Sequence, residues 1–310
     1  MRPALSVIVF TVLSGAGLGL FSILAFGSLL DGAFTLGDRS RSIGGAIALV
    51  LVVAGLLSST LHLANPRNAW RAVTQFRYSW LSREAILAMM FLPIASLHVA
   101  APYTNAPDYL RVLIAITGIA LAWGILLCTG MIYACLKTIP QWNSPVVPLS
   151  YFILGHWSGA LIAATIVVLD GSDPRAYIVL CAGLLVASSA VKLAYYLRFD
   201  RPRRDQRTLI DALGVTAAAA KLLDVGHAQR TFLTQEFLFR VGRRHALVLR
   251  LVFMLLSFVA PLVVLASWSD AALYLGAAAF SCLAGLLVER WLFFAEAEHV
   301  VRLYHGAQKV

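Results

Sequence analysis

The sequence predicts an all-α, polytopic integral membrane protein, a helical bundle with eight transmembrane helices and with both termini in the cytoplasm. Apolar residues make up 60% of the 310 residues and charged residues only 13%, which places the chain outside the soluble class. Eight windows of about 20 residues carry almost no charge, the length that a helix needs to cross a hydrocarbon core of about 30 Å. Basic residues are also divided very unequally between the two ends of these windows. We therefore treat residues 1–310 as one integral membrane domain.

The eight windows follow one another along the chain. They cover residues 6–30, 43–63, 85–101, 112–134, 149–169, 176–197, 251–269 and 271–288. The first window follows Arg2, as in a secretion signal, but it is longer than the roughly 7 to 15 apolar residues of a signal peptide. We interpret it as a retained first helix.

The distribution of lysine and arginine gives the orientation. Of the 25 basic residues, Lys192 lies inside the sixth window, and the four that fall opposite the N-terminus are Arg39, Arg41, Arg111 and Arg175. All the others, Arg290 among them, are assigned to loops on the side of the N-terminus. Because cytoplasmic loops are enriched in lysine and arginine, both termini are expected in the cytoplasm. The net charge of +10 then needs no nucleic-acid partner.

One cytoplasmic connection, residues 198–245, is too long to be a simple turn. It contains an apolar series at helical spacing with arginines on the other faces, which predicts an amphipathic helix on the membrane surface. The apolar members are Leu233, Phe237, Leu238 and Val241. This helix either anchors the loop or docks a soluble partner.

Ionisable side chains at membrane depth are costly, so each one is a functional hypothesis. His62, Glu84, His156 and Lys192 all fall toward the cytoplasmic side, whereas His98 lies near the opposite end of the third window. A one-sided cluster favours a site for an amphipathic electron carrier, such as a quinone, over a path across the membrane. It also argues against a transporter, which remains the alternative from a different class.

Quinone chemistry needs a group that exchanges a proton with the carrier oxygen and a second group that passes the proton to water. We assign the first role to His62 and the second to Glu84. The other residues expected to bind the ring, by hydrogen bonding, packing or depth, are Asn65, Trp80, Arg83, Tyr151 and His156.

Each of these residues also has a purely structural interpretation. Glu84 is suited to the N-terminus of the third helix or to an ion pair with Arg83. Trp80 and Tyr151 are typical of an aromatic belt at the membrane interface, and His156 of a histidine bonded to a helix carbonyl. A haem b subunit is a further alternative, with His62 and His156 as its axial pair.

No metal site or nucleotide site is expected. The four cysteines, Cys128, Cys135, Cys181 and Cys282, form no CxxC pair, which disfavours a disulfide framework and a zinc or iron–sulfur site. The sequence also has no Walker loop, Rossmann glycine pattern or HExxH motif in a usable context. A self-contained hydrolase, kinase or dehydrogenase therefore has no support.

Two segments resemble the membrane-anchor subunits of dimethyl sulfoxide reductase-type molybdenum oxidoreductases. They are LHLANPRNAWRAV at residues 61–73 and SWLSRE at residues 79–84. By this resemblance His62 takes the place of a histidine linked to quinol binding, and Glu84 that of the nearby carboxylate. Residues 231–250, TFLTQEFLFRVGRRHALVLR, look like the branch that serves cytoplasmic sulfite-oxidising complexes.

The resemblance implies an anchor that exchanges electrons between an iron–sulfur subunit and ubiquinone or menaquinone, without haem. Molybdopterin and the iron–sulfur clusters belong to partner subunits, so the anchor carries the quinone site and no molybdenum centre. The arginines expected to contact the docked partners are Arg67, Arg71 and Arg77. Sulfite oxidation is favoured, and the alternative is a dimethyl sulfoxide reductase anchor that oxidises quinol.

Overall fold

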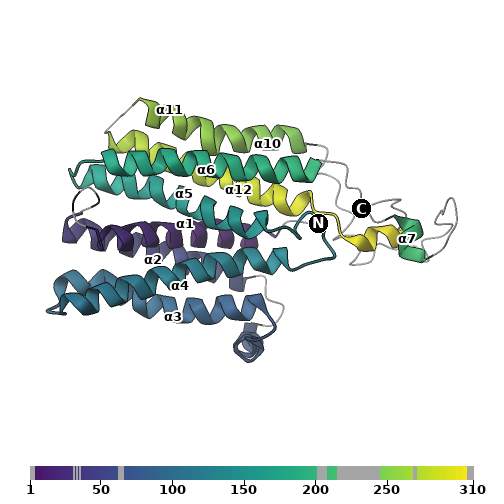
Figure 1. The fold of residues 1–310 in the computed structure, drawn as a ribbon, viewed down its shortest axis with the longest axis horizontal. Coiled ribbons are helices and arrows are strands. Elements are labelled where there is room, and N and C mark those ends of the chain that lie inside the picture. Colours follow the sequence, from purple (N-terminus) through teal and green to yellow (C-terminus); the bar gives the residue numbers. More distant parts are fainter. Residues whose placement is uncertain are drawn as a thin grey trace.

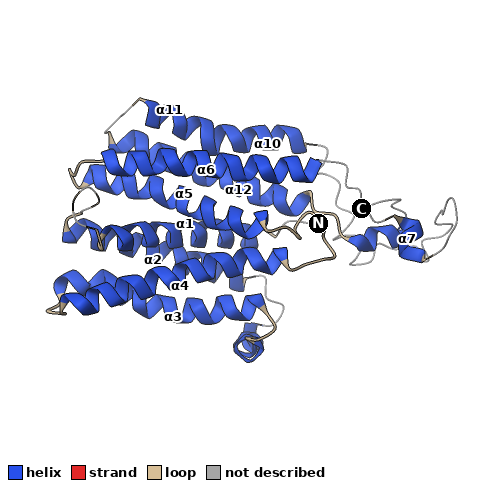
Figure 2. Ribbon diagram, in the orientation of Figure 1, coloured by secondary structure: helices blue, strands red, loops and turns tan. Residues whose placement is uncertain are grey.

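The computed structural model describes residues 4–30, 32, 34, 36–61, 66–200, 208–214, 245–267 and 271–305. These residues form long helices joined by short connections (Figures 1 and 2). Within them, eight helical segments are long and apolar enough to cross a membrane, which confirms the predicted number. The fold class predicted from the sequence is therefore correct.

The eight spans lie close to the predicted windows. They are α1 (Leu5–Gly27), α2 (Asp38–Thr60), α3 (Trp80–Ala100) continued by η2 (Ala101–Tyr103), α4 (Asp108–Ala134), α5 (Val146–Leu169), α6 (Arg175–Asp200), the α10–α11 span (Ala246–Ala266) and α12 (Ala272–Ala295). The short helix η1 (Pro66–Gln75) precedes α3. Successive spans alternate in direction, so the start of α1 and the start of α3 lie at the same end of the bundle. The arginine-rich connection before α3 lies at this end too. We call this the basic end and the opposite one the far end.

Several helix ends lie beyond the hydropathy windows, and two of them position the site. The third helix begins at Trp80 rather than at 85, because the hydroxyl of Ser79 accepts a hydrogen bond from the backbone N–H of Ser82 and caps the helix. The last helix continues to Ala295, beyond the predicted end at 288. In both cases the helix extends through charged residues that a hydropathy window excludes.

Helix α1 lies at the centre of the bundle and packs against α2, α4, α5 and α12. Its contact with α5 is very close, because Gly15 and Gly19 face Gly155 and Gly159. A Cβ atom at Gly19 would overlap the carbonyl oxygen of Gly155, and one at Gly159 would overlap the backbone of Leu20. Small residues spaced four apart allow such backbone contact in membranes.

The remaining helices flank this centre. Helices α3 and α4 pair on one side, and α6, α10, α11 and α12 gather on the other side (Figure 1). The start of α3 and the end of α12 both lie at the basic end. This arrangement brings chemistry-bearing residues of α3, α4, α5, α6 and α12 to one end of the bundle.

The seventh span is interrupted by a π-helical segment, η3 (Leu255–Val259), between α10 (Ala246–Met254) and α11 (Ala260–Ala266). A π-turn leaves a backbone carbonyl out of the regular i to i−4 pattern. Here the indole N–H of Trp157 on α5 donates to the carbonyl oxygen of Ser257 over 3.0 Å. The irregular turn thus supplies the acceptor that a fully buried tryptophan requires.

Outside the spans, α7 (Leu209–Leu213) packs on η4 (Val300–His305) through the buried side chains of Leu209 and Leu303. The amphipathic helix predicted around Leu233 to Val241 lies outside the described residues, so it stays a prediction. The cytoplasmic location of the termini is likewise a prediction from the charge distribution.

Candidate functional site

His62, one of the two residues predicted to exchange protons with the quinone, lies outside the described residues, as does Asn65, which was expected to bind the ring. Arg67 belongs to η1, but its side chain is also outside the described part. The structure does place the other predicted residues. They lie on α3 and α5, and in the connection that leads into α3.

Glu84 is buried between α3 and α4, with only 3% of its surface exposed. Its carboxylate oxygen Oε1 accepts a hydrogen bond from the hydroxyl of Thr129 on α4. Thr129 Oγ1 also lies 2.9 Å from the carbonyl oxygen of Ile125 in its own helix, which fixes the hydroxyl in place. An acidic group is thus held inside the membrane domain by a polar partner on the neighbouring helix.

Arg83 does not form an ion pair with Glu84. Its Nε donates to the carbonyl oxygen of Phe76 over 3.0 Å and its Nη2 to that of Arg77 over 2.8 Å. The guanidinium also lies 4.2 Å from the ring centroid of Trp80. Arg83 and Trp80 therefore fix the connection to the start of α3. Glu84 has its polar contact with Thr129 on α4 instead.

The connection before α3 presents exposed aromatic and basic side chains. Trp70 is 66% exposed and Tyr78 87% exposed, and Arg71 and Arg77 are exposed between them. Figure 1 shows η1 as a short helix set across the direction of the long helices, beside the start of α3. Two of the three predicted docking arginines are therefore at the surface of the basic end.

Tyr151 does not face the start of α3. Its ring stacks on that of Tyr133, with centroids 5.6 Å apart, and Cζ of Arg290, on α12, lies 3.8 Å from the Tyr151 centroid. Tyr133 follows Thr129 by one turn on α4. The contacts therefore lead from Glu84, across α4, to Tyr151 and Arg290 in the interior of the bundle.

Arg290 belongs to a buried ionic cluster that the sequence interpretation missed. Glu289 Oε1 lies 2.6 Å from Lys192 Nζ, and Glu289 Oε2 lies 2.7 Å from Arg290 Nε. All three side chains are at most 5% exposed. Counting Arg290 as a residue of a cytoplasmic loop was wrong, because α12 continues through it; the apolar run WLFFA that follows was the available signal.

A second set of charges continues this cluster toward the end of the bundle. Arg250 on α10 contacts Glu296 over 2.9 Å and Asp200 over 2.8 Å. Burial raises the pKa of Glu296, and the hydrogen bond from Arg250 opposes this effect. The six side chains of the two sets carry three charges of each sign when all are ionised, so the network is balanced as a whole.

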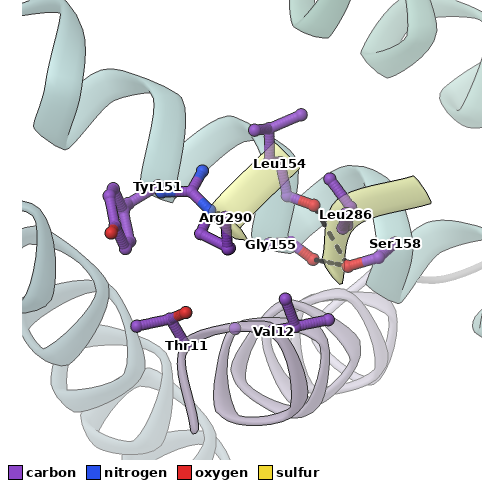
Figure 3. Close-up of a pocket in the computed structure, with 9 residues that line it drawn as sticks. Thr11, Val12, Tyr151, Leu154, Gly155, Ser158, Leu286 and Arg290 are labelled. Atoms are coloured by element: carbon purple, nitrogen blue, oxygen red, sulfur yellow. Dashed lines mark hydrogen bonds between the residues drawn. The ribbon is translucent and has the colours of Figure 1, made fainter. Parts of the chain in front are cut away.

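A small cavity lies between α1, α5 and α12, and Tyr151 and Arg290 border it (Figure 3). Its volume is about 20 Å³, which is room for about one water molecule and too little for a quinone ring. The Tyr151 hydroxyl has no hydrogen-bond partner among the described residues, although it is buried.

His156 is held by two hydrogen bonds. Its Nδ1 lies 2.8 Å from the carbonyl oxygen of Phe152, and its Nε2 accepts from the indole N–H of Trp123 over 3.0 Å. Both ring nitrogens therefore have hydrogen-bond partners within the protein, as expected for a histidine with a purely structural role. A role as a haem ligand would require the bond from Trp123 to break.

His98 is buried at the far end, where its ring packs edge-on against Phe21 with centroids 5.4 Å apart. It is remote along α3 from Glu84, as the sequence predicted. Among the described residues, no group of three or more histidine, cysteine, aspartate or glutamate side chains is arranged to hold a metal ion.

Comparison with known proteins places this bundle in a family. The model of the DMSO reductase anchor subunit (DmsC) matches residues 1–295. The C subunit of sulfite dehydrogenase from Allochromatium vinosum is 32% identical over 323 aligned positions, which cover 98% of this chain and 99% of the relative. The C chain of anaerobic dimethyl sulfoxide reductase from Escherichia coli K12 is 27% identical over 167 positions, 53% of this chain and 58% of the relative. The protein belongs to the DMSO reductase anchor subunit family and is a multi-pass membrane protein.

Proposed function

We propose that the protein is the membrane-anchor and quinone-reactive subunit of a molybdopterin oxidoreductase that oxidises sulfite. The observation that carries this proposal is the similarity over the full length to the C subunit of a sulfite dehydrogenase. In this function the protein anchors an iron–sulfur subunit and a molybdopterin subunit at the bacterial inner membrane. Electrons pass from the iron–sulfur subunit to ubiquinone or menaquinone.

The start of α3 supports a quinone site at the basic end. It combines a buried carboxylate, Glu84, with two partly exposed side chains, the aromatic Trp80 and the cationic Arg83. The reduction of a quinone takes up two electrons and two protons, so a proton donor must lie within the membrane boundary. Glu84 has that position, and His62 precedes η1 in the connection that leads to it.

The exposed side chains of η1 and the following turn support docking of the iron–sulfur subunit at the same end. Arg71 Cζ lies 5.8 Å from the ring centroid of Trp70, and both side chains are exposed. Aromatic residues and arginine are enriched in the cores of protein interfaces. A cluster docked here would lie beside the start of α3, which shortens the distance for electron transfer.

Sulfite oxidation is favoured over dimethyl sulfoxide reduction by coverage as well as by identity. The sulfite dehydrogenase relative aligns with 98% of this chain, whereas the dimethyl sulfoxide reductase relative aligns with 53%. The second candidate function is therefore a sulfoxide reductase anchor in which electrons run from quinol to the partner subunits.

The test is to purify the tagged protein with its partners and to measure sulfite-dependent quinone reduction and sulfoxide-dependent quinol oxidation. We expect sulfite to be the active substrate. His62→Ala is expected to abolish quinone-linked turnover and Glu84→Gln to slow it, while the complex still assembles. Asp173→Asn, at an exposed aspartate of the far end, is the matched control for Glu84→Gln.

Three results would contradict parts of the proposal. Normal quinone-linked rates in both His62→Ala and Glu84→Gln would refute the site. Recovery of the protein without molybdopterin and iron–sulfur subunits would refute the anchor function, and transport would then be the leading hypothesis. Activity with sulfoxide alone would reverse the direction of electron flow and leave the anchor function standing.

A further inference from the structure

Glu84 is almost closed off from solvent. Only 3% of its surface is exposed, and its carboxylate is bonded to the hydroxyl of Thr129. The neighbouring Arg83 is turned away, to the carbonyl oxygens of Phe76 and Arg77. Because the proposed quinone chemistry consumes protons, a buried carboxylate at its site needs other polar groups that bring protons to it.

Two tyrosines lead inward from this carboxylate. Tyr133 follows Thr129 by four residues on α4, so both side chains lie on the same face of that helix. The Tyr133 ring stacks on that of Tyr151, with centroids 5.6 Å apart and ring planes 19° apart. Both tyrosines are buried. The pair therefore connects the contact between α3 and α4 with α5.

The hydroxyl of Tyr151 has no structural role among the described residues. It is buried, and it has no hydrogen-bond partner in this part of the chain. Figure 3 shows its oxygen on the side of the ring away from Leu286 and Ser158. A buried hydroxyl without a partner is destabilising, and a phenylalanine at the same place would avoid that cost. Such a group calls for a functional explanation.

The ionic cluster lies on the other side of Tyr151. Cζ of Arg290 is 3.8 Å from the Tyr151 ring centroid, and Arg290 Nε is 2.7 Å from Glu289 Oε2. Arginine does not release its proton in proteins, so Glu289 is the group beside it that exchanges one. The other oxygen of Glu289 accepts from Lys192 Nζ over 2.6 Å. Ser188, one turn before Lys192 on α6, adds a second buried hydroxyl without a partner among the described residues.

The cluster also leads to solvent at the basic end. Arg250 contacts Glu296 over 2.9 Å and Asp200 over 2.8 Å. The Asp200 side chain is 54% exposed, that of Glu296 is 6% exposed and that of Glu289 is 2% exposed. Carboxylates thus occur with decreasing exposure from the surface at Asp200 to the interior at Glu289.

We infer that the hydroxyls of Tyr133 and Tyr151 relay protons between Glu289 and Glu84. A hydroxyl both donates and accepts, so Tyr151 gives its proton toward Tyr133 and takes another from the side of Glu289, and both tyrosines end unchanged. The part of this relay in catalysis rests on the proposed function. There, two electrons come from the iron–sulfur subunit and two protons from the cytoplasm, so the charge balances for each quinone reduced.

The test needs neither quinone nor partner subunits. The purified full-length protein in detergent is moved into heavy water at an acid pH at which Glu84 is protonated, and its carboxyl C=O band is followed by infrared spectroscopy. The band of Glu84 is the one missing from Glu84→Gln. We expect Tyr151→Phe to slow deuterium exchange at Glu84 about tenfold or more, because phenylalanine has no hydroxyl to pass the proton on.

Tyr177→Phe is the matched control. Tyr177 is also buried, but its hydroxyl donates to the carbonyl oxygen of Phe34 at the far end over 3.0 Å. This variant loses a hydrogen bond, so it should lower the melting temperature and leave the exchange at Glu84 unchanged. Tyr151→Phe should do the opposite, with slower exchange and no loss of melting temperature. A purely structural hydroxyl at Tyr151 would not produce this contrast.

A second variant tests whether the two tyrosines form one path. Tyr133→Phe should slow the exchange as Tyr151→Phe does, and the double variant should be no slower than either single one, because both hydroxyls serve the same route. In the assembled complex, Tyr151→Phe should also slow sulfite-dependent quinone reduction and increase its solvent isotope effect.

Two outcomes would overturn the inference. Unchanged exchange in Tyr151→Phe would mean that protons reach Glu84 directly from the basic end, and equal slowing in Tyr177→Phe would mean a general effect on the bundle. Absence of quinone chemistry in the wild-type complex would instead refute the proposed function, and the exchange at Glu84 would still decide whether the relay exists.

Discussion

The carboxylate of Glu84 on α3 accepts a hydrogen bond from the hydroxyl of Thr129 on α4, inside the membrane domain. The bond connects two helices of a pair whose contact is otherwise largely apolar. It also gives the proposed proton-exchanging group a defined partner. The function of Glu84 should therefore depend on a residue outside the two segments that carry the family resemblance.

Thr129→Val tests this dependence. Valine has nearly the same shape but no hydroxyl, so the carboxylate is left without its donor, at a cost of about 1–3 kcal/mol to the charged form. We expect quinone-linked turnover in the assembled complex to fall roughly tenfold, and Thr129→Ser to retain it. Thr165→Val on α5, where the hydroxyl bonds to the carbonyl oxygen of Leu161 in its own helix, is the control. Equal rates in the two valine variants would contradict the role of Thr129.

The ionic cluster predicts an order of stability between two single variants. Glu289→Gln leaves two buried cations, Lys192 and Arg290, without their shared anion. Breaking a buried ion pair in this way costs about 3–5 kcal/mol. Lys192→Met leaves the neutral pair of Glu289 and Arg290, so it should cost less. Thermal unfolding of the purified protein in detergent measures both, and a larger loss for Lys192→Met would show that the charges are balanced differently.

The glycine contact between α1 and α5 predicts a strong steric effect. Gly19→Leu and Gly159→Leu would force the two helices apart, because a Cβ at either position overlaps the opposite backbone. We expect a loss of folded protein in the membrane for both. Gly183→Leu on α6 should have little effect, since a Cβ there meets no atom within 4 Å. Normal yields of all three variants would refute the close approach.

Asp170 predicts a pH dependence at the far end. Hydrogen bonds from Ser172 and Ser40 lower the pKa of Asp170 below its usual 3.8, so the folded state stabilises the carboxylate. That stability is present above the usual pKa and is lost as the pH falls through the lower value. The difference in melting temperature between the wild type and Asp170→Asn should be constant near neutral pH and vanish once the pH has fallen below the lowered pKa of Asp170. A difference for Asp170→Asn that persists in acid would exclude this origin.

The number and order of the spans could be predicted from the sequence, because hydropathy measures how favourably a segment is transferred from water to lipid. It did not predict the partners of buried polar groups, because these come from helices far apart in the chain. Lys192 was recognised as an ionisable residue at membrane depth, but its partner Glu289 lies in α12. Arg290 was interpreted as a loop residue because charge ended the last hydropathy window before it.

The candidate site was predicted in a similar way. The motif before α3 located Glu84, and the helix direction placed it at the basic end. Neither could show that Tyr151 turns toward Tyr133 and Arg290 rather than toward Trp80, because side-chain direction depends on the packing of α5 between its neighbours. For His156, depth alone did not distinguish a chemical role from a structural one, in which two hydrogen bonds hold its ring.

The cluster of Lys192, Glu289 and Arg290 also bears on how the protein enters the bilayer during synthesis. Charged residues oppose the insertion of a helix into lipid, and α12 carries two in succession, Glu289 and Arg290, near its end. Helix α6 brings the compensating lysine and is synthesised first. The last span is thus expected to stay beside the translocation machinery until it packs against α6. Glu289 and Arg290 would then enter lipid already paired with Lys192.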